Sequence, residues 1–116
     1  MNRDRALVYK EQDKYVEAEE SYQRALAILQ NALGLDHPDV ATNLTNLALL
    51  YQAQGKFIKA VGLHRQALAI REKALGPEHP SVARSLSNLV GIYQVQGRHA
   101  EAEQLRKRVL DIEKNK

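Results

Sequence analysis

The chain repeats itself at a fixed spacing of 42 residues. When residues 25–66 are shifted forward by 42 positions, they align with residues 67–108 without a gap, and 20 of the 42 aligned residues are identical. The same shift backwards aligns Tyr51 with Tyr9 and Ala60 with Ala18. Periods of about 20 to 50 residues are typical of stacked structural units, each of which buries its apolar face only against its neighbours. The sequence therefore predicts a linear array of repeats.

The 116 residues form a single repeat domain in this interpretation. The domain comprises a partial first unit at residues 1–24, complete units at 25–66 and 67–108, and a C-terminal helix end at 109–116. The flanking pieces together make about three quarters of a unit, so the array has about three repeats. These features fit a complete protein and a segment of a longer one equally well.

Each unit has the sequence pattern of two helices. Apolar residues recur every three or four positions over residues 40–51 and 57–70, as on one face of a helix. Gly55 separates the two helices, and Gly76 followed by Pro77 ends the second. Applied to the whole chain, the pattern predicts an all-α protein of six helices in three antiparallel pairs, at residues 2–12, 14–33, 38–54, 56–75, 80–96 and 98–114.

Positive charge is concentrated between Lys56 and Leu75, where five basic side chains accompany one acidic residue, Glu72. Such a stretch is able to attract an acidic partner or a nucleic acid. Base stacking requires exposed aromatic residues, and the single aromatic residue here, Phe57, falls on the predicted buried side. We therefore favour a solvated helix face, with nucleic-acid binding as the less favoured alternative.

Composition limits the other classes of function. The chain has no cysteine, which excludes a disulfide framework and a thiolate metal site. It shows no apolar run typical of a signal peptide or a membrane span. We expect a soluble cytoplasmic protein without a cofactor.

Period and helix content alone also fit HEAT or armadillo repeats, so the residue pattern must distinguish these families. A recurring series of large, small and aromatic residues occupies equivalent positions of the second and third units: Leu44, Leu47, Ala48, Tyr51 and Ala60, then Leu86, Leu89, Val90, Tyr93 and Ala102. Residues 67–83, followed by Asn88-Leu89, Tyr93 and residues 96–98, resemble the 42-residue tetratricopeptide repeat (TPR) of kinesin light chains. The resemblance covers nearly the whole chain. It implies a right-handed α-solenoid that acts as a scaffold for protein binding.

The resemblance also implies where a ligand would bind. In TPR proteins the first helix of each unit lines a concave groove that holds a peptide or protein segment. The positions of this sequence that match the groove are Thr42, Thr45, Asn46, Leu49, Gln52 and Ala53 in the second unit, and Arg84, Ser87, Asn88, Gly91, Gln94 and Val95 in the third.

Asn46 and Asn88 stand one repeat apart and are the sharpest candidates. A carboxamide donates to a peptide carbonyl and accepts from a peptide N–H, so repeated asparagines are able to hold an extended backbone. Relatives in the TPR family use asparagine at this position in that way. Alternatively, each asparagine bonds a neighbouring helix and fixes the superhelix. Arg84 is either a ligand for a carboxylate or an ordinary exposed side chain.

The recurrence of equivalent residues also indicates the role of side chains that resemble catalytic or metal-binding groups. Equivalent loop positions lie roughly 10 Å apart in adjacent repeats, too far for His37 and His79 to share a metal ion, so we expect them to cap helices. We expect Tyr9, Tyr51 and Tyr93 to be core residues. No catalytic motif recurs, so an enzyme is not expected.

The repeat pattern is broken by polar residues where core residues are expected, at Asn2, Arg5, His64 and Arg106. We interpret these breaks as the solvated ends of the array. The leading hypothesis for function is a binding module for a peptide or protein. The alternatives are a structural protein that forms homo-oligomers through its exposed ends and an RNA-binding helical repeat.

Overall fold

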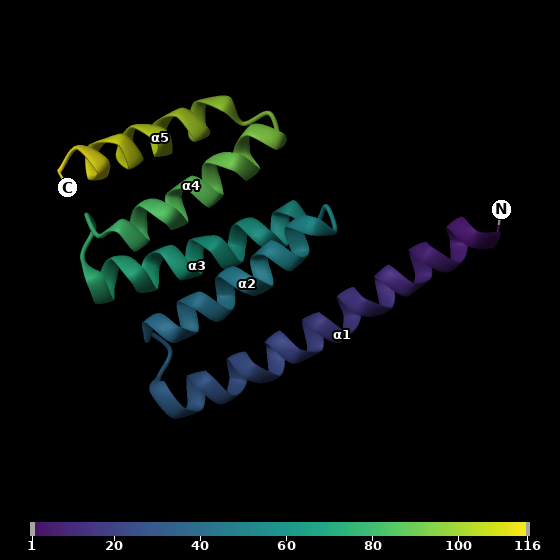
Figure 1. The fold of residues 1–116 in the computed structure, drawn as a ribbon. Coiled ribbons are helices and arrows are strands. Elements are labelled where there is room, and N and C mark those ends of the chain that lie inside the picture. Colours follow the sequence, from purple (N-terminus) through teal and green to yellow (C-terminus); the bar gives the residue numbers. More distant parts are fainter. Residues whose placement is uncertain (1, 116) are drawn as a thin grey trace.

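The protein is built entirely of helices over the residues that the structure describes. The computed structural model describes residues 2–115, with side chains described from residue 12 onward. The helices are α1 (Asn2–Leu33), α2 (Pro38–Ala53), α3 (Phe57–Leu75), α4 (Pro80–Val95) and α5 (His99–Lys114). Each packs against the next one along the chain, and Figure 1 shows the resulting row of helices. This arrangement confirms the predicted all-α solenoid.

The starts of α2 and α4 follow the same local rules. Pro38 and Pro80 occupy the first helical position, where a missing N–H is tolerated. The Nδ1 atom of His37 accepts a hydrogen bond from the backbone N–H two residues later at 3.0 Å, and that of His79 does the same at 3.1 Å. Each histidine thus satisfies one of the free N–H groups of a helix N-terminus. The predicted capping role of both residues is confirmed.

The turns between paired helices depend on glycine. Gly55 and Gly97 both have φ of +77°, which a residue without Cβ adopts readily. The following N–H closes the turn, as when Lys56 donates to the carbonyl of Tyr51 at 2.9 Å. In the first unit Asp13 stands at this position, and the backbone there remains helical.

The predicted count of six helices is therefore wrong, because the expected helices at 2–12 and 14–33 are one continuous helix, α1. At 1.5 Å per residue its 32 residues extend about 48 Å, twice the length of α2. In Figure 1 the N-terminal half of α1 runs on beyond the turn that joins α2 to α3. The array thus contains two complete helix pairs preceded by a long single helix.

Small residues and tyrosines form the contacts between helices. Ala60 and Ala102 are 0% and 1% exposed, and their small side chains let the paired helices approach closely. Tyr51 and Tyr93 are 6% and 0% exposed, which confirms that both are core residues. Tyr9, assigned to the same position by the period, lies outside the described side chains.

The two tyrosines also connect successive units. The hydroxyl of Tyr51 donates to Oε1 of Glu19 in α1 at 2.5 Å. This hydrogen bond, followed by burial and then by the negative charge, raises the pKa of Tyr51. The hydroxyl of Tyr93 instead accepts a hydrogen bond from Arg65 in α3. The repeated tyrosine thus joins α2 to α1 and α4 to α3. Tyr51 donates its hydrogen bond, whereas Tyr93 accepts one.

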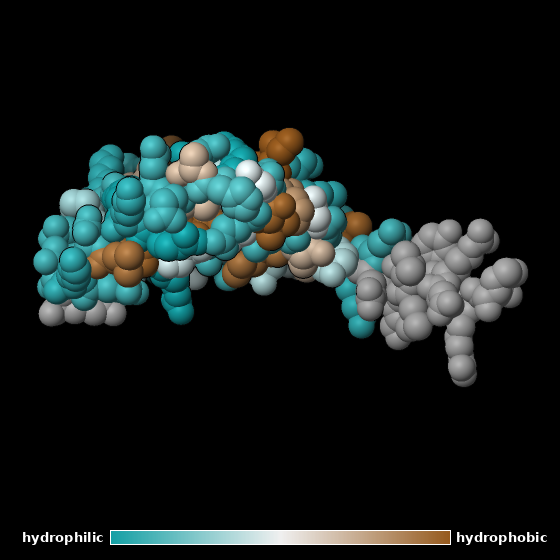
Figure 2. All heavy atoms as spheres, turned by 90° about the horizontal axis from the view of Figure 1, so that it is seen from above, coloured by the Kyte–Doolittle hydropathy of each residue, from teal (hydrophilic) through white to brown (hydrophobic). Residues whose placement is uncertain are grey.

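The outer surface is mostly polar. Figure 2 shows the face seen from above as largely hydrophilic, with hydrophobic residues exposed singly or in small groups. Within the described part of the chain, no helix is both long enough and apolar enough to cross a membrane.

Candidate functional site

The residues expected to line a groove lie on α2 and α4, and all but Thr45 point away from the fully buried side of each helix. At about 100° per residue, Asn46 and Leu49 point almost opposite to Leu44 and Leu47, which are buried. The same holds for the equivalent positions of α4. We call the surface formed by these side chains the α2–α4 face.

Most of the expected residues are exposed. Leu49 and Val95 are large apolar side chains that are 44% and 66% exposed. The exposed polar members of the face are Thr42, Asn46, Arg84, Ser87 and Gln94, and the half-buried members are Gln52, Asn88 and Gly91. The face therefore offers amide, hydroxyl and guanidinium groups beside isolated apolar ones.

Thr45 differs from the rest of the expected set. It is only 8% exposed, and its hydroxyl donates to the carbonyl of Ala41 at 3.0 Å within the same helix. This is the back-bonding geometry common for threonine inside helices, and it leaves the hydroxyl turned away from solvent. Thr45 thus supports α2 and does not project from the face.

Three buried polar residues lie beneath the α2–α4 face, next to the half-buried Gln52 of that face. We call these four residues the polar seam: Gln52 on α2, His64 and Arg71 on α3, and Ser85 on α4. Nε2 of His64 lies 3.4 Å from Oε1 of Gln52, and Nη1 of Arg71 donates to Oγ of Ser85 at 2.5 Å. Because His64 and Arg71 are seven residues apart on one helix, they lie on the same side of α3. The polar seam thus links α3 to both α2 and α4.

His64 is held in its neutral form. It is 1% exposed, and its Nδ1 atom has no hydrogen-bond partner among the described residues. Burial, followed by the nearby positive charge of Arg71, lowers the pKa of His64 to about 4. The imidazole is therefore uncharged at neutral pH.

Two arginines lie close together without an acidic partner in the described part of the chain. Arg71 is 7% exposed, and its pKa is lowered first by burial and then by the charge of Arg84. The described ion pairs involve neither guanidinium. A buried cation that lacks a counter-charge favours an anion nearby.

The repeat pattern does not predict the polar seam. The expectation that His64 marks an end of the array is wrong, because His64 lies in the middle of the protein and is buried. The one sign of the seam in the sequence is that the residue type changes from unit to unit at its positions. Arg71, for example, stands where the other units have Leu29 and Glu113. Of the other breaks, Arg106 forms an ion pair with Glu103 at 2.7 Å, and the side chains of Asn2 and Arg5 lie outside the described part.

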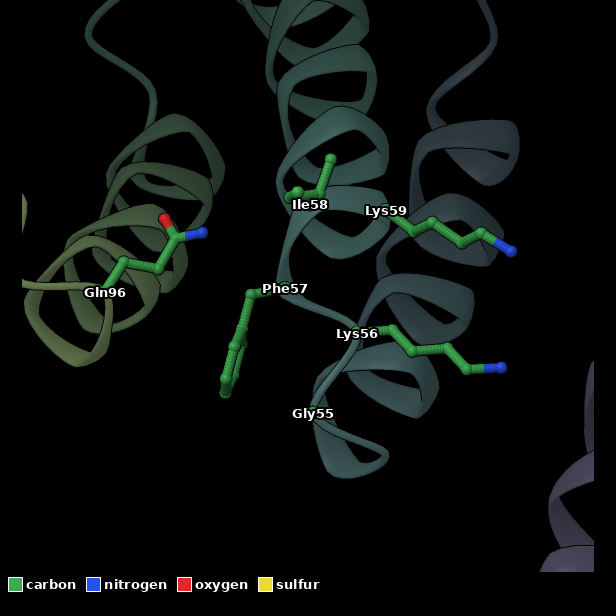
Figure 3. A pocket seen from close by; sticks show the side chains of 6 residues that line it. All are labelled: Gly55, Lys56, Phe57, Ile58, Lys59 and Gln96. Atoms are coloured by element: carbon green, nitrogen blue, oxygen red, sulfur yellow. The ribbon is translucent and has the colours of Figure 1, made fainter.

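Hollows in the surface occur away from the α2–α4 face. One of about 490 Å³ lies beside the turn between α2 and α3, where Phe57 and Ile58 lie near Gln96 at the end of α4 (Figure 3). Two others, of about 370 and 320 Å³, lie between α1 and α3 and contact the buried side of α2. The α2–α4 face is accordingly a row of exposed side chains and not one of these hollows.

The sequence model of the tetratricopeptide repeat family matches residues 1–73 and again residues 44–115. The chain belongs to the tetratricopeptide repeat family. Solved structures agree with the 42-residue repeat type of this TPR protein. BtubC (BKLC) from P. vanneervenii is 28% identical with a TM-score of 0.83, and the match covers 93% of this chain and 42% of BtubC.

A putative kinesin light chain from Podosopora anserina with nearly identical TPR-like repeats is also similar. It is 35% identical with a TM-score of 0.75, over 94% of this chain and 52% of that one. The structure of a single-residue variant of it is 33% identical with a TM-score of 0.76, over 94% of this chain and 51% of that one. No curated protein matches the sequence. The TPR protein thus spans about half the length of these structural neighbours.

Proposed function

We propose that this TPR protein is a binding module whose α2–α4 face captures an extended peptide or protein segment. TPR folds generally serve as protein-interaction modules, and non-enzymatic scaffolding is the usual role of the family. The observation that carries the proposal for this chain is the state of the two asparagines. Asn46 is exposed and Asn88 is half-buried, so both carboxamides reach the surface, where they can bond a ligand backbone.

The remaining side chains of the face suit the same ligand. Leu49 and Val95 supply apolar contacts that become buried when a peptide lies across the face. Arg84 supplies a bidentate donor, and the uncompensated charge of Arg71 behind it favours a ligand that carries a carboxylate. The proposed ligand is therefore an extended segment with an acidic residue opposite Arg84.

The test begins with peptides selected against the wild-type protein from a random displayed library. Their dissociation constants are then measured for the wild type, for Asn46→Ala with Asn88→Ala, and for Asn31→Ala, an exposed asparagine of α1 outside the face. Loss of about one net hydrogen bond at each position amounts to about 2 kcal/mol, or roughly thirty-fold weaker binding.

The double variant should unfold at nearly the same temperature as the wild type, because neither carboxamide is part of the core. Peptides that bind the double variant as tightly as Asn31→Ala would refute the assignment of the face. Retention on RNA with a steep salt dependence, and no peptide binding, would instead support the alternative based on the basic stretch at 56–75.

A further inference from the structure

A furrow runs between α1 and α3. Both helices pack on α2, and the hollows of about 370 and 320 Å³ occupy the space that remains between them. The two hollows share Gln66 of α3 as a wall residue, so they are continuous. We call the combined hollow the α1–α3 furrow. Its floor includes Leu44 and Leu47, which point away from the α2–α4 face, so the furrow and that face lie on different sides of α2.

Exposed apolar side chains lie at the two ends of the furrow. Ile58 lines one hollow and is 85% exposed, and Leu35 lines the other and is 67% exposed. These are the two most exposed large hydrophobic residues in the described part of the chain. The equivalent residues of the next unit are the smaller Ala100 and Pro77. Single exposed apolar residues are common, but a pair on one hollow favours an interaction surface.

The next unit shows why the furrow is open. Between α3 and α5, Nη2 of Arg108 lies 3.6 Å from Oε2 of Glu72, and this ion pair ties the two helices together. Shifted back by 42 residues, the same two positions are Gln66 and Gln30, which both line the α1–α3 furrow. Two neutral carboxamides cannot form this ion pair, so that connection is lost between α1 and α3.

The wall of the furrow on α3 is also made of small residues. Gly62 and Ala69 line the furrow, whereas the equivalent residues of α5 are the longer Gln104 and Asp111. A Cβ at Gly62 would have no other atom within 4 Å, so the space beside it is open. The side chains that would narrow the furrow are thus shortened on α3.

Positive charge gathers at the Ile58 end of the furrow. The Nζ atoms of Lys56 and Lys59 lie 5.8 and 5.3 Å from the centre of the Tyr51 ring, which lines the furrow. Figure 3 shows both lysine side chains extending away from Gln96. The hydroxyl of the same tyrosine donates to the carboxylate of Glu19, so one negative group faces two ammonium groups. This end therefore favours a ligand with an acidic residue.

The length and the rim of the furrow suit an extended chain. From Ile58 to Ala69 the furrow follows α3 for about 16 Å, at 1.5 Å per residue. An extended chain covers that distance in about five residues, and its side chains at positions i and i+4 point to the same side. The carboxamides of Gln30 and Gln66 are able to bond the peptide groups of such a chain, whereas a helix satisfies its own.

We propose that the α1–α3 furrow binds an extended segment of a partner protein, with apolar residues four positions apart and an acidic residue beside the one that packs on Ile58. The second apolar residue packs on Leu35. At that end Asp36 is paired with Lys73 at 2.7 Å, so the segment needs no charge there. Because this surface and the α2–α4 face lie on different sides of α2, the two sites are independent.

The first experiment uses two short peptides as probes, because the direction of the bound chain is open. They are acetyl-Asp-Leu-Thr-Gln-Thr-Leu-amide and acetyl-Leu-Thr-Gln-Thr-Leu-Asp-amide, titrated into protein with labelled isoleucine and leucine methyl groups. With at least one probe, we expect saturable NMR shifts of the methyl groups of Ile58 and Leu35. A probe with lysine in place of aspartate should bind roughly threefold more weakly.

Truncation of the exposed isoleucine tests the apolar contact. Ile58→Ala should weaken binding of the probe roughly tenfold, because the contact area at this end is lost. Leu110→Ala truncates a side chain of α5 that is 53% exposed and lies outside the furrow, so it should leave binding unchanged.

A second pair of variants exchanges the open and the tied state. Gln30→Glu with Gln66→Arg places the ion pair of the next unit across the furrow, and it should weaken probe binding roughly tenfold or more. The control, Glu72→Gln with Arg108→Gln, removes the existing ion pair between α3 and α5 and should leave probe binding unchanged.

Two outcomes would overturn the inference. One is the absence of a shift at Ile58 with either probe at millimolar concentration. The other is a variant with Gln30→Glu and Gln66→Arg that binds the probe as tightly as its control. Shifts at Leu49 and Val95 without a shift at Ile58 would also count against the furrow, while supporting the α2–α4 face as the peptide site.

Discussion

Acidification should destabilise the protein through one buried histidine. His64 has a pKa of about 4 in the folded protein, against about 6.5 in an unfolded chain. Between these values the unfolded state binds more protons, so the free energy of unfolding falls as pH falls from about 6.5 towards 4. Above about pH 6.5 the neutral His64 makes its full contribution to the free energy of unfolding. Below about pH 4 both states bind the proton, so this contribution no longer changes with pH.

The size of the effect follows from the two pKa values. On moving from pH 8 to pH 5, protonation of the unfolded histidine lowers the free energy of unfolding by about 2 kcal/mol. For a domain of this size that corresponds to a decrease of roughly 10 °C in the melting temperature. Arg71, whose positive charge adds to the effect of burial, opposes protonation of His64 in the folded state.

The assay is chemical unfolding followed by circular dichroism at pH 8 and pH 5, for the wild type and for His64→Gln. Glutamine is neutral at both pH values and keeps a donor able to reach Gln52, so the variant should lose about 2 kcal/mol less on acidification. His99→Gln removes an exposed histidine and should behave like the wild type. A His64→Gln variant that loses as much stability as the wild type would refute the reasoning.

Three further substitutions test the fold. Gly97→Ala should lower the free energy of unfolding by about 1–2 kcal/mol in a denaturant titration, because φ is +77° and the space around the new Cβ is otherwise open. His79→Ala should cost about 1 kcal/mol through loss of the helix cap, whereas the neighbouring change Glu78→Ala should have little effect. Tyr51→Phe should cost about 1 kcal/mol, because the hydroxyl that donates to Glu19 is lost. A double-mutant cycle with Glu19→Ala, which removes the acceptor, should show coupling; an additive result would contradict the hydrogen bond.

Local signals in the sequence predicted much of the fold. The glycines at 55 and 97, the histidine caps before Pro38 and Pro80, and the helix periodicity each depend on a few neighbouring residues. Such signals are readable without knowledge of the packing. The predicted break between residues 12 and 14, which the structure does not have, has a local cause as well, since Asp13 lacks the conformational freedom of glycine.

The polar seam and its properties were not predictable in the same way. The sequence shows His64 and Arg71 as breaks in a repeat, which is equally typical of a solvated end and of a buried polar contact. Only packing places His64 beside Gln52 and Arg71 beside Ser85, on helices that are separate in the sequence. The charge state of a buried group depends on that packing, because solvent exclusion shifts its pKa. The positions of the α2–α4 face are those that the resemblance to TPR proteins implies, and packing removes Thr45 from them.

By itself the sequence determined the repeat, its 42-residue length, the helical content and the family, because each follows from the pattern of residues within and between units. The tertiary structure decided which equivalent residues are buried. Ile28 and Ile70 have the same identity and the same place in the period, yet one is 62% exposed and the other 7%. The physical reason is that a side chain is buried only where a second surface packs on it. Val40, Ala41 and Leu44 of α2 pack in one cluster with Ile70, whereas Ile28 belongs to none of the described core clusters.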